Sequence, residues 1–85
     1  MGEERARSAA ELTLEGMRRE IAALLHDDPE EIGTDDSLID LGLDSMRAMA
    51  LVRRWQEAGV RAEFAAFAET PTLGHWWDVV RRSRG

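Results

Sequence analysis

Residues 41–51, LGLDSMRAMAL, mark the point where a long acidic loop gives way to a helix. Gly42 allows a sharp turn, Asp44 is a favourable N-cap, and Ser45 falls in the first turn of a helix that we predict at about 45–58. Projected at about 100° per residue, this helix has two apolar arcs. The arc predicted to face the core holds Ala48, Leu51, Val52 and Trp55, and the adjoining arc holds Ser45, Met46, Met49 and Arg53. The helix should therefore pack on one side and leave two methionines beside an exposed serine.

Three further helices are predicted around this one. The first covers about 9–26, with Ser8 and Glu11 as a possible capping box and Thr13 as a competing N-cap. A short helix covers 64–68, and a final helix begins with Thr70 as N-cap and Pro71 at its first position and runs to about 82. Because no strand pattern occurs, we expect an all-α fold, a small four-helix bundle with a short third helix.

The loop between the first and second predicted helices is long for so small a domain. Residues 27–44 include eight carboxylates, and ordered loops of this length usually bring a functional residue into place. Five apolar residues are expected to anchor it to the core: Ile32, Leu38, Ile39, Leu41 and Leu43. The loop should therefore be fixed, and it should deliver Ser45 to the start of the second helix.

Composition limits the partners of the protein. The chain has 85 residues, which suits one domain, and its formal net charge of −6 disfavours nucleic acid and anionic membranes as partners. It has no cysteine, and its N-terminus lacks the features of a secretory signal, so we expect a cytoplasmic protein. Protein partners are the better expectation, with the chain acting as a monomer.

Neither a metal site nor a catalytic centre is expected. The acidic side chains of 35–40 do not fit a calcium-binding loop, because Asp40 stands at the glycine position and Met46 at the final glutamate position. His26 and His75 are separated and have no obvious nucleophile partner. We predict that both histidines are solvated residues near helix ends.

The motif at 41–46 resembles the phosphopantetheine attachment site of acyl and peptidyl carrier proteins, and the resemblance extends over roughly residues 14–82. Residues 44–51 with Trp55, and Pro71-Thr72 followed by Trp76-Trp77, look most like the aryl carrier domains of nonribosomal peptide systems. The resemblance implies a carrier domain at 13–82, with a flexible tail or the start of the first helix at 1–12 and a C-terminal tail at 83–85. It also implies a 4'-phosphopantetheine arm on Ser45 that holds an aryl or aminoacyl group as a thioester.

The same resemblance implies which residues bind the cofactor and which bind partners. The implied cofactor-binding residues are Gly42, Leu43, Asp44 and Ser45, and the implied partner-binding residues are Met46, Met49, Arg53, Phe64 and Ala68. The implied partners are a phosphopantetheinyl transferase, which Asp44 also assists, an adenylating ligase, and a condensation-type enzyme or acyltransferase. For Phe64, burial in the core together with Phe67 is an open alternative. A polyketide-type acyl carrier and a cofactor-free helical interaction module are alternative functions.

Overall fold

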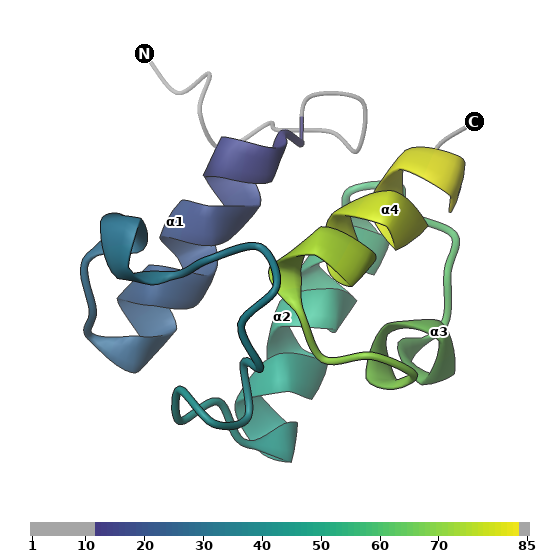
Figure 1. Cartoon of the computed structure of the whole chain (residues 1–85). Helices are drawn as coiled ribbons and strands as arrows, with labels where there is room; N and C mark the ends of the chain where they lie inside the picture. The colour runs from purple at the N-terminus through teal and green to yellow at the C-terminus, as the bar shows by residue number, and fades with distance from the viewer. Residues whose placement is uncertain (1–11, 84–85) are drawn as a thin grey trace, which may run out of the picture.

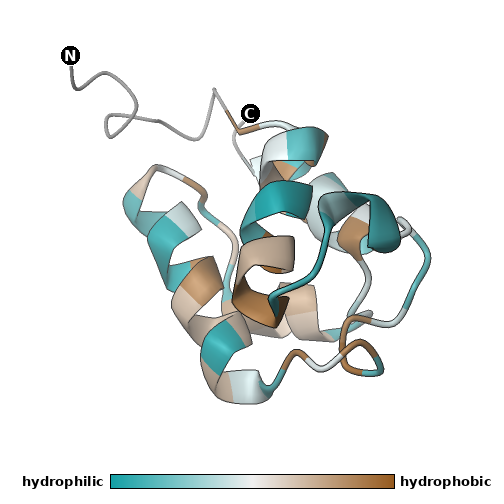
Figure 2. Cartoon of the chain, turned by 90° about the vertical axis from the view of Figure 1, so that its left-hand side faces the viewer, coloured by the Kyte–Doolittle hydropathy of each residue, from teal (hydrophilic) through white to brown (hydrophobic). Residues whose placement is uncertain are grey.

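The computed structural model describes residues 12–83 and confirms the all-α prediction for this part of the chain. Its elements are α1 (Leu14–Leu25), the 3₁₀ helix η3 (Pro29–Glu31), α2 (Ser45–Glu57), α3 (Phe64–Ala68) and α4 (Leu73–Ser83). Figure 1 shows α1, α2 and α4 as the longer helices and α3 as a short helix at the lower right, joined to the end of α2 by a loop that descends on the right. Hydrophilic and hydrophobic residues alternate along the ribbons in Figure 2, as amphipathic helices require.

The first helix begins later than predicted. Thr13 is the N-cap of α1, and its Oγ1 accepts a hydrogen bond from the Gly16 amide at 2.9 Å. Residues 12 and 13 are therefore not helical, so the predicted start at 9 is wrong over these two positions; Ser8 and Glu11 lie outside the described residues. Leu12 is nevertheless buried in the core. The helix ends at Leu25, one residue before the predicted end at 26, because His26 takes a left-handed conformation with φ 60°.

The last helix also begins later than the sequence predicts. Thr72, not Thr70, accepts the capping bond from the His75 amide, and α4 begins at Leu73. The residues before it are extended instead, since the Leu38 amide donates to the Pro71 carbonyl at 2.8 Å and Ser37 forms an isolated antiparallel bridge with Thr72. Pairing with the loop decides the boundary, and that pairing joins residues more than thirty positions apart, beyond the reach of a local pattern.

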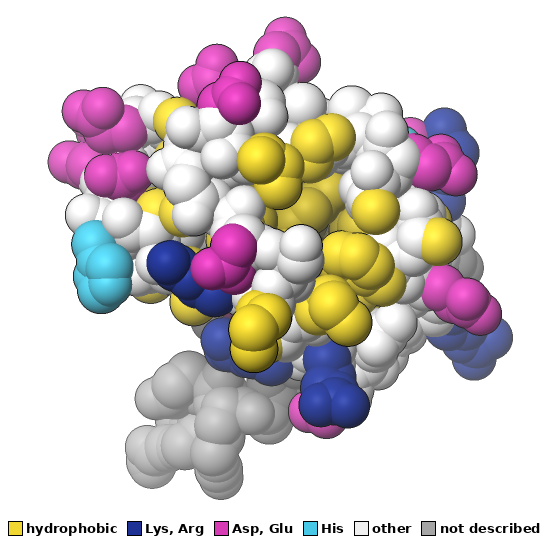
Figure 3. All heavy atoms as spheres, turned by 90° about the horizontal axis from the view of Figure 1, so that it is seen from below, with side chains coloured by type: hydrophobic (Ala, Val, Ile, Leu, Met, Phe, Trp, Pro, Cys, Tyr) yellow, Lys and Arg dark blue, Asp and Glu magenta, His cyan; other side chains and the backbone are white. Residues whose placement is uncertain are grey.

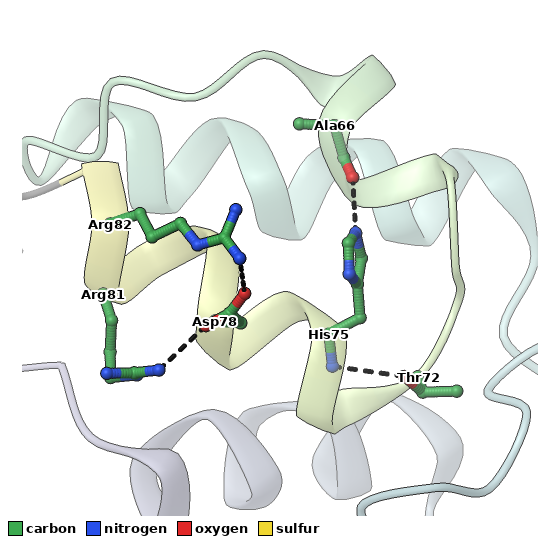
Figure 4. Close-up of polar contacts among 6 residues, drawn as sticks. All are labelled: Ala66, Thr72, His75, Asp78, Arg81 and Arg82. Atoms are coloured by element: carbon green, nitrogen blue, oxygen red, sulfur yellow. Dashed lines mark hydrogen bonds and ion pairs between the residues drawn. The ribbon is translucent and has the colours of Figure 1, made fainter.

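His75 is not a solvated residue, contrary to the sequence prediction. It is half-buried, and its Nε2 lies 2.8 Å from the Ala66 carbonyl of α3. Figure 4 shows this ring directed from α4 to α3, while its own backbone amide donates to Thr72.

The loop is ordered largely as expected, with one exception. Ile32, Leu38 and Leu43 are buried and Leu41 is half-buried, but Ile39 is 53% exposed. The Leu43 amide donates to the Leu38 carbonyl, so the chain between these two buried residues is a tight turn whose tip is exposed. Arg18 of α1 also holds the loop, by donating to the Ile32 carbonyl.

The core is centred on three aromatic side chains. Trp55 of α2, Phe67 of α3 and Trp76 of α4 have ring centroids 5.7–6.1 Å apart in tilted or edge-to-face arrangements. All three are at most 2% exposed, whereas Trp77 is half-buried at the edge. The predicted core arc of α2 is confirmed, since Ala48, Leu51, Val52 and Trp55 are its buried residues.

Candidate functional site

The site begins with the residue that starts α2. Asp44 has an extended backbone, and its Oδ1 accepts a hydrogen bond from the Arg47 amide at 2.8 Å, as an N-cap residue should. The other carboxylate oxygen, Oδ2, lies 3.5 Å from Arg47 Nε. The capping role predicted for Asp44 is therefore observed, and both of its carboxylate oxygens interact with the same residue.

Ser45 is the first residue of α2 and is exposed. The amides of Ser45 and Met46 make no hydrogen bond to any described residue, in contrast to the capped amide of Arg47. Unpaired N–H groups and the helix dipole give this end of the helix a positive potential. The serine hydroxyl therefore stands at an accessible position that favours a neighbouring anion.

Gly42 and Leu43 fix the approach of the chain to this serine. Gly42 has φ +113°, a conformation that L-residues with a side chain rarely adopt. A Cβ built there would meet only Leu25 Cδ2, at 3.8 Å, so backbone conformation rather than space requires the glycine. Leu43 is 1% exposed and anchors the next position in the core.

Arg47 was not predicted to have a role at the site. Its Nη1 donates to the Leu24 carbonyl in the last turn of α1, while its backbone and Nε interact with Asp44. It thereby links the start of α2 to the end of α1. The two helices meet here through residues 23 positions apart, so local periodicity gave no signal for this contact.

The face where α2 begins is rich in exposed apolar side chains. Met46 is 80% exposed and Met49 53% exposed, as expected for the second arc of the helix. Ile39, at 53%, is a third large exposed hydrophobic residue. Figure 3 looks at the molecule from the end where α2 begins and shows hydrophobic side chains gathered across that face. We call Met46, Met49 and Ile39 the apolar surface.

The remaining predicted partner-binding residues differ in exposure. Arg53 and Ala68 are exposed, and Arg53 forms no ion pair with another described residue. Phe64 is half-buried and packs against the core, whereas Phe67 is fully buried. Phe64 therefore packs against the core beside Phe67 and also remains partly accessible, which leaves both alternatives for it open.

A family model described as "Phosphopantetheine attachment site" matches residues 15–80, which reach from the first turn of α1 to the last turn of α4. The chain belongs to this family. The protein is thus a carrier, a noncatalytic shuttle whose family works with a 4'-phosphopantetheine prosthetic group.

Three relatives show the range of proteins in which similar carriers occur. The carrier is 34% identical over 76 residues to the acyl carrier protein ScoB of Streptomyces coeruleorubidus, and the match covers 89% of each chain. It is 44% identical over 64 residues to isochorismatase of Bacillus subtilis, and 41% identical over 70 residues to phenyloxazoline synthase MbtB of Mycolicibacterium paratuberculosis. These matches cover 75% and 82% of the carrier but only 20% and 6% of the two larger proteins. No solved structure matches the chain.

Within residues 12–83, no helix is long and apolar enough to cross a membrane.

Proposed function

We propose that Ser45 is the residue to which the 4'-phosphopantetheine arm is attached. The observation that carries this proposal is the exposed Ser45 at the first position of α2, directly after the capping residue Asp44. When bound, the arm supplies a thiol on which an acyl group is held as a thioester. The protein itself supplies the hydroxyl, the position and the surface that partners recognise.

The residues around Ser45 fit a phosphodiester. The helix N-terminus favours an adjacent anion by about 0.3–1 kcal/mol, and the amides of Ser45 and Met46 have no other partner among the described residues. The carboxylate of Asp44 is the opposing negative charge, and its ion pair with Arg47 partly compensates it. Gly42 presents no side chain toward the approaching transferase, and Leu43 holds the loop in place.

Peptide mapping tests the position of the arm. The carrier is incubated with coenzyme A, magnesium and a broad-specificity phosphopantetheinyl transferase, then digested and fragmented by mass spectrometry. We expect the added mass on Ser45 and no added mass on Ser8, Ser37 or Ser83, which serve as internal controls. Modification at any of these three serines would contradict the assignment.

We further propose that the cargo is an aryl or aminoacyl group. In this proposal, an adenylating ligase loads the carrier and a condensation-type enzyme or acyltransferase unloads it in nonribosomal peptide or related biosynthesis. Support comes from the similarity to part of a phenyloxazoline synthase, whose product name includes a phenyl group, and to part of an isochorismatase. The match to ScoB over most of both chains favours a second candidate, an acyl carrier of the polyketide type.

Competition between acids separates the two candidates. The arm-bearing carrier is offered a mixture of benzoate-type, amino and aliphatic acids with ATP and adenylating ligases for each class of acid, and its intact mass is then measured. Selective gain of a benzoyl-type or aminoacyl mass supports the first candidate. Gain of an aliphatic acyl mass alone would favour the second.

Recognition by these partners is assigned to the apolar surface together with Arg53, Phe64 and Ala68. Met46, Met49 and Arg53 lie on the same arc of α2 as Ser45, and all are exposed. Methionine adapts its shape to different binding surfaces, which suits a protein that must dock to several enzymes in turn. Such docking should be transient, and the carrier should act as a monomer.

A further inference from the structure

The short helix α3 is only weakly stabilised by its own residues at its two ends. It has five residues, Phe64–Ala68, and Phe67 is its buried residue. Glu63 at its N-cap forms no side-chain capping bond. At its other end, the Phe67 carbonyl would need an N–H four residues later, where Pro71 has none. Helices this short are unstable alone, so the placement of α3 depends on its neighbours.

Two successive side chains of α4 supply the missing donors. His75 Nε2 lies 2.8 Å from the Ala66 carbonyl, and Trp76 Nε1 donates to the Phe67 carbonyl at 2.8 Å. Because a carbonyl can only accept, the hydrogen of the imidazole must be on Nε2. Figure 4 shows the His75 ring extending from α4 to Ala66. The two donors thus cap the C-terminal end of α3 from another helix.

Both donors are themselves fixed. Trp76 is 2% exposed and packs edge-to-face against Phe67, and the backbone amide of His75 is bonded to Thr72 Oγ1 at the start of α4. The carbonyls of Ala66 and Phe67 therefore accept hydrogen bonds from side chains that are already held in place. Of the two bonds, that of Trp76 is buried and that of His75 is only partly buried, so His75 can be altered with less damage to the core.

We propose that His75 and Trp76 are positioning residues for partner recognition, which hold α3 so that Ala68 and the accessible part of Phe64 keep a fixed place for partners. This inference rests on the proposed role of Phe64 and Ala68 in docking. The partner would meet a preformed surface, and it would not have to order α3 on binding.

Replacing His75 by Phe removes the N–H and keeps a planar ring. Loss of one hydrogen bond should raise the population of displaced α3 about fivefold. Hydrogen exchange measured by NMR should then be about fivefold faster for the amides at 67–69 but unchanged within twofold in α1 and α2. The KM of the adenylating ligase for the variant carrier should rise severalfold with little change in kcat. His75→Gln, whose amide nitrogen can reach the same carbonyl, should restore both values.

A control on the same helix removes polar contacts that do not involve α3. Asp78 pairs with Arg81 and Arg82 within α4, as Figure 4 shows, so Asp78→Asn should leave α3 exchange and the ligase KM unchanged. Trp76→Phe is a second test and should accelerate α3 exchange in the same direction. Unchanged α3 exchange in His75→Phe, equal acceleration in every helix, or an unchanged ligase KM would each overturn the proposal.

Attachment of the arm to each variant is measured by intact mass in the same samples. Normal attachment with altered α3 exchange and KM supports the positioning role. Failure of the wild-type protein to gain the arm would refute the proposed function, and the exchange data would still decide whether His75 holds α3.

Discussion

At the scale of single residues, Asp44 both caps α2 and places a negative charge beside Ser45, and substitutions can separate these two roles. Its Oδ1 caps α2, and its Oδ2 places a negative charge next to Ser45 and Arg47. Capping needs only an acceptor oxygen, which asparagine also has, whereas the contribution to the transferase implied for Asp44 needs the charge.

Asp44→Ala should therefore lose about 0.5–2 kcal/mol of unfolding free energy, and Asp44→Asn should stay within a few tenths of a kcal/mol of the wild type. Both variants should be modified more slowly by the transferase, because both lack the carboxylate. Urea denaturation and the initial rate of arm attachment check the two effects. A normal attachment rate for Asp44→Asn would show that the charge has no part in modification.

Gly42 gives a second prediction at this scale. With φ +113°, replacement by L-alanine should cost about 1–2 kcal/mol of unfolding free energy through backbone strain alone. Thermal or urea unfolding measures the loss. A chemically synthesised chain with D-alanine at 42 is the matched control, because the backbone of a D-residue prefers positive φ. Equal destabilisation by both enantiomers would contradict this explanation.

At the scale of elements, the second helix was the most predictable part of the chain. Its apolar spacing correctly placed Trp55 inside and Met46 and Met49 outside, because each position depends only on helical geometry. The start of α4 was not predictable in this way. Thr70 and Thr72 are both acceptable caps, and the bond from the Leu38 amide to the Pro71 carbonyl decides between them.

Contacts around the site that join residues distant in sequence could not be predicted either. Ser45, Asp44 and Gly42 are adjacent in sequence and could be predicted together as a motif. The contact of Arg47 with Leu24 and the bond from His75 to Ala66 join different helices, so no local pattern indicates them. Ile39 was wrongly expected to be an anchor, because hydrophobicity alone does not show which residue of a tight turn stays exposed.

The exposed arc of α2 leads to a prediction about docking. Met49→Asp should leave attachment of the arm unchanged and reduce kcat/KM at least tenfold with one or more of the loading and unloading enzymes, because a charge would replace an apolar contact. Ala50→Asp adds the same charge at an exposed position about 100° away on the helix and should have a smaller effect. Steady-state kinetics with each partner provides the comparison. Unchanged transfer by Met49→Asp with every partner would remove this residue from the docking face.

At the scale of the whole molecule, stability depends on a small core in which three helices each contribute one aromatic ring. Trp55, Phe67 and Trp76 are mutually in contact, and Phe67 is the main link between α3 and that core. A domain of this size has little stability to spare, since folded proteins are commonly stable by only about 5–15 kcal/mol.

Phe67→Ala should therefore cost about 3–5 kcal/mol, a large part of the total, by leaving a cavity between the two tryptophans. Phe64→Ala should cost less, because the Phe64 ring is only half-buried. Urea denaturation of the two variants compares them directly. An equal loss for both would mean that the core is not centred on Phe67.

We propose that the fold as a whole presents Ser45 for attachment of the phosphopantetheine arm. Intact-protein mass, measured before and after incubation with coenzyme A, magnesium and a broad-specificity transferase, tests it on the wild type and on Ser45→Ala. Circular dichroism should show that the variant is folded, since Ser45 is exposed and its side chain contributes little to packing. We expect the wild type to gain the mass of one arm and folded Ser45→Ala to gain none; a wild type without added mass, or a variant that still gains the arm, would refute attachment at Ser45.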